Sequence, residues 1–138
     1  SFFLKTHWKM TIIGKFGSGM FNHQDTLRAG SWQLQINGRK KWHLCDPSQS
    51  NRLYRAGDID TFSPNYEDYP LFKDAICFQE ILSPGDIIYY PKDYWHQTYN
   101  LDFPTISFGS SIVSRENYNE VKKELQEECN GRGIVFVR

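Results

Sequence analysis

The sequence has 138 residues, 16 basic and 16 acidic side chains, and 39% hydrophobic residues. This length fits one domain, and the hydrophobic content excludes a disordered chain. A net charge of zero gives no electrostatic support to a nucleic-acid partner, and no apolar run approaches the roughly 20 residues of a membrane span. We therefore expect a single domain over residues 1–138, with neither nucleic acid nor a membrane as its partner.

The cysteines, Cys45, Cys77 and Cys129, are odd in number and form no Cys-x-x-Cys pair. This pattern favours free thiols, with Cys45 and Cys77 packed inside strands, over a disulfide framework. Residues 1–5 also lack the basic and long apolar segments of a signal peptide. The sequence thus predicts an intracellular protein of the cytoplasm or nucleus.

Short strand-like runs separated by turn residues dominate the chain. They predict strands at 10–13, 32–36, 39–45, 76–82, 87–90, 96–101 and 105–113. Such a series, with turn signals between its members, is typical of a small β barrel or sandwich. We therefore expect a mostly β fold whose barrel core occupies about residues 10–113.

The remaining segments are a loop, a helix and a short tail. The polar stretch 48–69 predicts a long loop, and loops of this length are usually functional or mobile. Ser114 has the character of an N-cap for a helix over about 115–129. Residues 134–137 form one more strand or a tail.

Asn37-Gly38 is the strongest hairpin signal in the chain, and it predicts that the strands on either side pair around a two-residue turn. The resulting register places a mixed set of side chains on one face: Ser31, Gln33, Gln35, Lys40 and Trp42. If that face lines a barrel, Lys40 points inward, and a buried lysine needs an anionic partner such as a ligand carboxylate. A solvated basic turn at Arg39–Lys41 is the alternative.

His23-Gln24-Asp25 places an imidazole and a carboxylate two residues apart, on one side of an extended segment. Two histidines and one carboxylate are the ligand set of non-haem Fe(II) sites. His96, at the head of a predicted strand, is the candidate third ligand, because His7 precedes the strands and His43 lies on the outer face of the hairpin. Each observation alone is weak, since His-x-Asp occurs by chance and His96 also fits a core histidine bonded to backbone.

Three segments together resemble motifs of the JmjC (Jumonji C) oxygenases, which belong to the cupin superfamily. Gly17 with His23-Gln24-Asp25 resembles the first cupin motif, and Gly85–Pro91 with His96 and Asn100 resembles the second. The segment 31–42 between them is typical of the JmjC group. The resemblance runs from about residue 10 to residue 113 and is closest to the small JmjC protein hydroxylases.

The resemblance implies a double-stranded β-helix (a cupin or jelly-roll barrel) with a C-terminal helix. The family fold has more chain before the first motif, so N-terminal elements are expected to be missing and the sequence to be a fragment. His23, Asp25 and His96 match the ligands of one Fe(II), and Lys40 matches the lysine that pairs with the distal carboxylate of 2-oxoglutarate.

Other positions are matched less directly. Ser31 and Gln33 fall where relatives place a polar side chain that helps to bind 2-oxoglutarate, and Asn100 matches a recurrent asparagine. Met20 and Gly109 depart from the family pattern, because relatives carry hydroxyl side chains at or near these positions.

The implied reaction uses Fe(II), 2-oxoglutarate and O2 to hydroxylate a side chain of a protein or peptide substrate, with succinate and CO2 as co-products. The 48–69 loop would help to shape the substrate groove. Lysine demethylation is the alternative within the same chemistry. A non-catalytic cupin that only binds a ligand and a sugar-binding or sugar-isomerising cupin are alternatives from other classes, and a homodimer through the terminal helix is left open.

Overall fold

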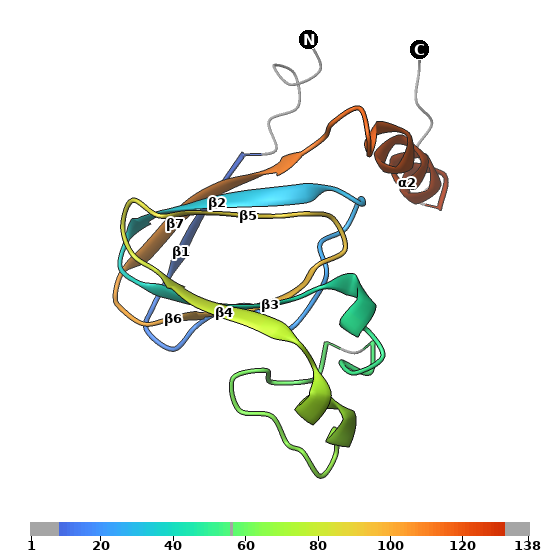
Figure 1. Cartoon of the computed structure of the whole chain (residues 1–138). Helices are drawn as coiled ribbons and strands as arrows, with labels where there is room; N and C mark the ends of the chain where they lie inside the picture. Colours follow the sequence, from blue (N-terminus) through green and yellow to red (C-terminus); the bar gives the residue numbers. More distant parts are fainter. Residues whose placement is uncertain (1–8, 56, 132–138) are drawn as a thin grey trace.

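A computed structural model describes residues 9–55 and 57–131, and these residues form two antiparallel sheets that face each other (Figure 1). The first sheet has the order β1 (Lys9–Gly14), β7 (Thr105–Ile112), β2 (Gly30–Asn37) and β5 (Ile87–Tyr90). The second has the order β4 (Cys77–Leu82), β3 (Lys40–Cys45) and β6 (Trp95–Asn100). This architecture confirms the expected mostly β, cupin-like fold. His7 and the segment 134–137 lie outside the described residues.

Side chains alternate strictly between the two faces of the second sheet, as the period of an extended strand requires. On β3, Trp42 and Leu44 point between the sheets and pack with Leu82 and Tyr90. The neighbouring strand β6 points His96 to the same side, as its contacts with the rings of Trp42 and Tyr90 show. The space between the sheets is therefore part apolar core and part polar site.

The predicted hairpin at Asn37-Gly38 is wrong. Strand β2 pairs with β5 and β7, whereas β3 pairs with β4 and β6, so the turn is a corner between two sheets. Gly38 takes a positive φ of 68° there, and the buried amide of Gln35 donates to the carbonyl oxygens of Asn37 and Gly38 at 2.9 Å each. A buried side chain thus replaces the hairpin hydrogen bonds. The side chains that the hairpin register placed on one face still point to a common interior, because β2 and β3 face each other across the barrel.

The long segment between β3 and β4 covers the outer face of the second sheet (Figure 1). It holds two short 3-10 helices, η1 (Pro47–Gln49) and η2 (Pro70–Asp74), and otherwise turns. Its Leu53, Ile59 and Phe72 pack on Cys45 and Trp95. The predicted loop is therefore a packed cover that builds a second apolar core.

The prediction of free thiols at Cys45 and Cys77 is wrong, because the structure joins them in a disulfide. They lie 32 residues apart in sequence but directly opposite each other on β3 and β4, with Cα atoms 4.3 Å apart. Only the strand order brings them together, and the sequence does not reveal that order. Free thiols therefore no longer support a reducing compartment, and the intracellular location stays a prediction.

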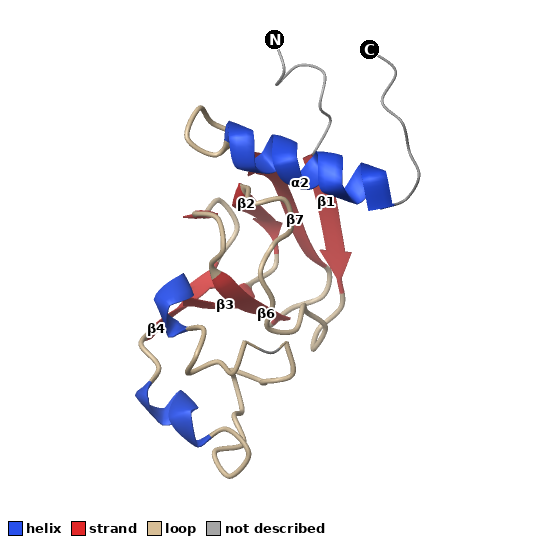
Figure 2. Cartoon of the chain, turned by 90° about the vertical axis from the view of Figure 1, so that its right-hand side faces the viewer, coloured by secondary structure: helices blue, strands red, loops and turns tan. Residues whose placement is uncertain are grey.

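Helix α2 (Tyr118–Gly131) lies across one end of the first sheet (Figure 2). It begins three residues after the predicted start, because Ser114 and Asn117 first form a turn in which Asn117 Oδ1 accepts from the Ser114 backbone at 2.7 Å. Val121 then packs on Ala29 and Val113. Among the described residues, no helix has the length and apolar character that crossing a membrane requires.

Candidate metal centre

His23 and His96 are direct neighbours on adjacent extended segments. The backbone amide of each donates to the carbonyl oxygen of the other, at 3.0 Å and 2.8 Å. Opposite residues in such a pair point to the same face, and their imidazole rings lie 4.1 Å apart. The predicted two-histidine arrangement therefore depends on backbone pairing between the loop before Asp25 and the start of β6.

Both imidazoles are fixed in one tautomer by backbone oxygens. Nδ1 of His23 lies 2.7 Å from the carbonyl oxygen of Phe21, and Nδ1 of His96 lies 3.0 Å from that of Tyr94. A carbonyl only accepts, so each Nδ1 carries a proton, and in the neutral imidazole Nε2 then keeps its lone pair. This is the usual way in which metal-binding histidines are oriented. The contact with Asp25 raises the pKa of His23, so an ion bound here would take the place of a proton on Nε2.

Asp25 presents one carboxylate oxygen to these two nitrogens. Its Oδ1 lies 3.6 Å from Nε2 of His23 and 3.5 Å from Nε2 of His96. Its Oδ2 accepts hydrogen bonds from Ser31 Oγ at 2.7 Å and from the Tyr90 hydroxyl at 3.0 Å. The second oxygen is thus held by protein donors, and only Oδ1 is left for a metal ion.

The electrostatics of the triad suit a cation. Burial opposes the charged form of Asp25, but the nearby His23 imidazole and hydrogen bonds from Ser31 and Tyr90 outweigh burial and hold the pKa of Asp25 below its usual value. Burial lowers the pKa of His96, which favours the neutral imidazole. Burial also raises the pKa of Tyr90, so its hydroxyl stays a donor.

These residues fit a single Fe(II). The three donor atoms all lie within 4.8 Å of one another, so one ion can contact all of them. Two imidazoles and one carboxylate on one side of an octahedral ion are the ligands of non-haem iron sites, which leave the other positions open.

The triad lies in a cavity of about 410 Å³ between the two sheets. Lys40 lines the same cavity, with 3% of its surface exposed, and its Nζ donates to Oε1 of Gln33 at 2.9 Å. Burial lowers the pKa of Lys40 to about 8. No carboxylate pairs with Lys40 in the described part of the chain, so its charge faces a cavity that suits an anion.

The other predicted cosubstrate residues separate into two groups. Gln33 contacts Lys40, and Asn100 lies directly opposite Lys40 in the pairing of β3 with β6. The amide nitrogen of Asn100 donates to Ser18 Oγ at 3.0 Å, while its buried Oδ1 has no partner among the described residues. Ser31, in contrast, is bonded to Asp25, so the structure places it with the metal ligands.

Three more side chains line the cavity without a role assigned to them from the sequence: Tyr90, Trp42 and Thr98. The hydroxyl of Tyr90 donates to Asp25. The indole of Trp42 is stacked on His96, and its buried Nε1 has no partner among the described residues. Thr98 lies two residues after His96 on β6, so the alternation of the strand predicts that both side chains point to the same face.

The two departures from the family pattern have different structural settings. Met20 lines the cavity and is 58% exposed, and its backbone amide donates to Thr98 Oγ1 at 3.1 Å. Gly109 lies against β2, where a Cβ atom would come within 2.6 Å of the carbonyl oxygen of Trp32. There is space for other side chains at position 20 but not at position 109.

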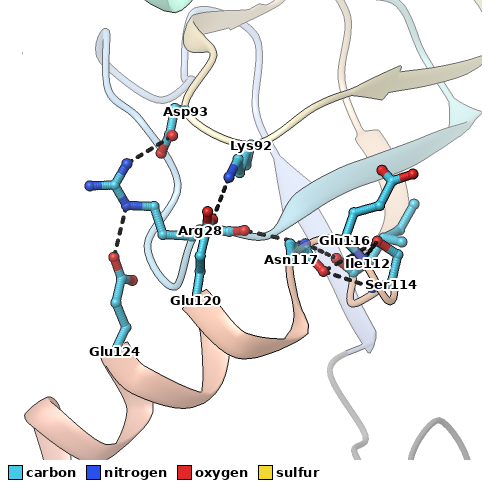
Figure 3. A network of polar contacts seen from close by, with 9 residues as sticks. All are labelled: Arg28, Lys92, Asp93, Ile112, Ser114, Glu116, Asn117, Glu120 and Glu124. Carbon is cyan, nitrogen blue, oxygen red and sulfur yellow. Dashed lines mark hydrogen bonds and ion pairs between the residues drawn. The ribbon is translucent and has the colours of Figure 1, made fainter.

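A polar network links α2 to the loops that carry the ligands (Figure 3). Arg28, three residues after Asp25, donates to Asp93 at 2.9 Å and to Glu124 at 3.0 Å. Lys92 pairs with Glu120 of the helix. The network therefore joins the loop after Asp25, the turn before His96 and the C-terminal helix.

Comparison with known proteins identifies relatives over most of the chain. A family model described as a cupin-like domain matches residues 8–121. HSPB1-associated protein 1 of Mus musculus is 30% identical over 116 residues, which cover 77% of this chain and 24% of that protein. The 2-oxoglutarate and iron-dependent oxygenase JMJD4 of Danio rerio is 34% identical over 130 residues, covering 89% of this chain and 31% of the relative.

Two further comparisons extend this set. The arginine-specific demethylase JMJ20 of Arabidopsis thaliana is 31% identical over 119 residues, covering 83% of this chain and 26% of that protein. The crystal structure of the Escherichia coli ribosomal oxygenase YcfD superposes with a TM-score of 0.54 at 20% identity, over 94% of this chain and 30% of that one. This likeness supports the fold. The chain spans between 24% and 31% of the length of these three curated relatives.

Proposed function

Because the chain belongs to the cupin-like domain family, we propose that it is an Fe(II)- and 2-oxoglutarate-dependent oxygenase of the JmjC type that hydroxylates a protein side chain. The observation that carries this proposal is the convergence of His23 Nε2, Asp25 Oδ1 and His96 Nε2 in the cavity that also holds the buried ammonium group of Lys40.

The protein's part in this chemistry is to bind and orient. Bound Fe(II) would supply the activation of O2 that oxidation of a C–H bond requires. His23, Asp25 and His96 would hold this ion, since their donor atoms converge on one place in the cavity. Ser31 and Tyr90 keep Asp25 to a single ligating oxygen, because both donate to Oδ2.

The cavity offers a complementary place for 2-oxoglutarate. Lys40 would pair with the distal carboxylate, and Gln33 already fixes the position of its ammonium group. Trp42 and Asn100 also line this cavity, and each has a buried polar atom that no described residue bonds. A dianion that brings one carboxylate to Lys40 would satisfy the buried cation.

A second cavity, of about 510 Å³, also has Asp25 in its lining, and we propose that it admits the substrate side chain. Its lining is polar and includes Gln24, Arg28, Asp93 and, from the segment after β3, Ser50. Asp25 lines both cavities. A side chain that enters this second cavity would therefore come close to Asp25, one of the three candidate ligands. This agrees with the expected contribution of the 48–69 loop to a substrate groove.

The test is succinate formation by the purified chain with Fe(II), ascorbate and 2-oxoglutarate. We expect His23→Ala and Lys40→Ala to lose succinate formation, because they remove a metal ligand and the buried cation. Lys122 is an exposed lysine of α2, so Lys122→Ala is the matched control and should retain succinate formation. Equal succinate from wild type and His23→Ala would refute the proposal.

The product separates hydroxylation from its alternatives. A stable mass gain of one oxygen on a protein or peptide indicates hydroxylation, whereas a methylated peptide that releases formaldehyde indicates demethylation, the reaction in the name of the Arabidopsis relative. Metal binding without turnover would leave a binding domain, and metal-dependent sugar isomerisation would leave a sugar-isomerising cupin.

A further inference from the structure

A second cluster of metal-binding side chains lies on the outer face of the second sheet. It consists of His43 and Cys45 on β3 and Cys77 on β4, whose donor atoms all lie within 4.8 Å of one another. His96 points to the opposite, inner face, so the sheet separates this cluster from the candidate iron centre. In the structure the two sulfur atoms are joined in a disulfide.

Two of the three donor atoms already have the separation that a tetrahedral metal site requires. Nδ1 of His43 lies 3.6 Å from Sγ of Cys45. In a tetrahedral zinc site with Zn–S bonds of about 2.3 Å and Zn–N bonds of about 2.0–2.1 Å, that edge is about 3.6 Å long. The two thiolates would need about 3.8 Å between them, so breaking the S–S bond and turning the Cys77 side chain completes three ligands.

The surroundings favour a neutral imidazole and a soft ion. Burial, and then the charge of Lys41, lower the pKa of His43 to about 4. The ring packs against Phe62 and Phe72, with centroids 6.1 Å away in each case. Two thiolates and one imidazole in an apolar setting are the ligands that Zn²⁺ prefers.

The cluster has an access route. Cys77 is partly exposed and lies on β4, an edge strand of the second sheet. Cys45, in contrast, is 1% exposed, so a reductant reaches the disulfide from the side of Cys77.

We propose that Cys45, Cys77 and His43 form a redox-controlled site for one soft divalent ion such as Zn²⁺. Two equivalents of an external thiol break the S–S bond, become oxidised to their own disulfide, and transfer two electrons and two protons to the cysteines. The ion then displaces both thiol protons and binds the two thiolates and the imidazole. Oxidation closes the site again.

Cobalt spectroscopy tests this proposal, because thiolate ligands give Co²⁺ an intense near-ultraviolet charge-transfer band. The chain is prepared with His23→Ala and Cys129→Ser, so that neither the candidate iron centre nor the third cysteine contributes. We expect the reduced protein to show the band, to bind one Zn²⁺ in competition with Co²⁺, and to lose the band on disulfide formation. Because the signal is independent of succinate formation, it separates this proposal from the oxygenase proposal.

Two variants assign the ligands. Cys77→Ser should abolish the band, and His43→Gln should shift it and weaken Co²⁺ binding while both cysteines remain. His43→Gln also gives an answer if Cys77→Ser fails to fold. A reduced, folded protein without the band would overturn the proposal, as would a disulfide that excess reductant leaves closed or a band unaffected by His43→Gln.

Discussion

Ser31 Oγ donates to Asp25 Oδ2 at 2.7 Å, and this bond gives a second role to a residue that the resemblance assigned to the cosubstrate. The Tyr90 hydroxyl donates to the same oxygen at 3.0 Å. Two donors on one carboxylate oxygen hold the group in a fixed plane and leave the other oxygen to face the histidines. The two hydroxyls are therefore positioning groups for the candidate metal centre.

Ser31→Ala and Tyr90→Phe should each weaken Fe(II) binding. Groups that orient metal ligands typically contribute about 10–100-fold to metal affinity. The dissociation constant can be measured by anaerobic titration with Fe(II), or with Co²⁺ as a stable substitute. Ser107→Ala is the matched control, since Ser107 is also buried but bonds Gln35. Equal affinities of Ser31→Ala and Ser107→Ala would contradict this role.

The Michaelis constant for 2-oxoglutarate should depend on the charge of Lys40. Burial lowers the pKa of Lys40 to about 8. As the pH rises through this value the free protein loses the ammonium charge, so cosubstrate binding is full below about pH 8 and weakens above it. One proton lost per site gives a rise of about tenfold in KM per pH unit on the alkaline side.

Lys40→Arg separates this titration from other causes, because a guanidinium group stays charged throughout the range. Whatever its absolute KM, the variant should show a flat profile from about pH 7 to pH 9.5. Initial rates of succinate formation at several pH values give both profiles. A flat wild-type profile, or a variant that rises in parallel with it, would assign the titration to another group.

The strands were predictable because their signals are local. Alternation and turn residues located each described strand to within two residues. The hairpin register paired the wrong strands, yet the face on which it placed Gln33 and Lys40 does line the cavity. The resemblance of short motifs suggested the candidate metal ligands, and the structure brings their donor atoms together. Their geometry then follows from one long-range backbone pair, His23 with His96.

The errors have a common physical cause, since they concern which strands lie next to each other. Asn37-Gly38 is compatible with both a hairpin and a corner, and the buried amide of Gln35 decides for the corner only once the two sheets exist. The disulfide of Cys45 and Cys77 needs β3 beside β4. The contact of Ser31 with Asp25 likewise depends on the path of the loop between them.

Substitutions at Gly109 and Met20 should have opposite consequences. Gly109→Ala places a Cβ atom against the carbonyl oxygen of Trp32 and should destabilise the protein by about 1–3 kcal/mol, the usual cost of overpacking. Met20→Thr replaces a mostly exposed side chain and should change stability by less than about 0.5 kcal/mol. Its hydroxyl should also lower KM for 2-oxoglutarate. Urea unfolding measures both stabilities, and an equally stable Gly109→Ala would contradict the close packing.

Trp42→Phe should weaken cosubstrate binding without a matching loss of stability. The buried Nε1 of Trp42 has no partner among the described residues, so its removal relieves a desolvated donor and offsets part of the lost packing. If this donor bonds a carboxylate of 2-oxoglutarate, its loss removes about 1.5–3 kcal/mol of binding and raises KM about tenfold or more.

Trp95→Phe provides the control, because the indole nitrogen of Trp95 already has a hydrogen-bond partner within the protein. Trp95 is buried on the outer face of the same sheet, and its Nε1 donates to Ser50 Oγ at 2.8 Å. This substitution removes the bond from the indole to Ser50, whose hydroxyl then keeps only its bond to the carbonyl oxygen of Pro47. Stability should therefore fall while KM for 2-oxoglutarate stays unchanged. Thermal unfolding and succinate kinetics of both variants give the comparison. A KM for Trp42→Phe equal to that of Trp95→Phe would show that the indole of Trp42 only packs against His96 and does not bind the ligand.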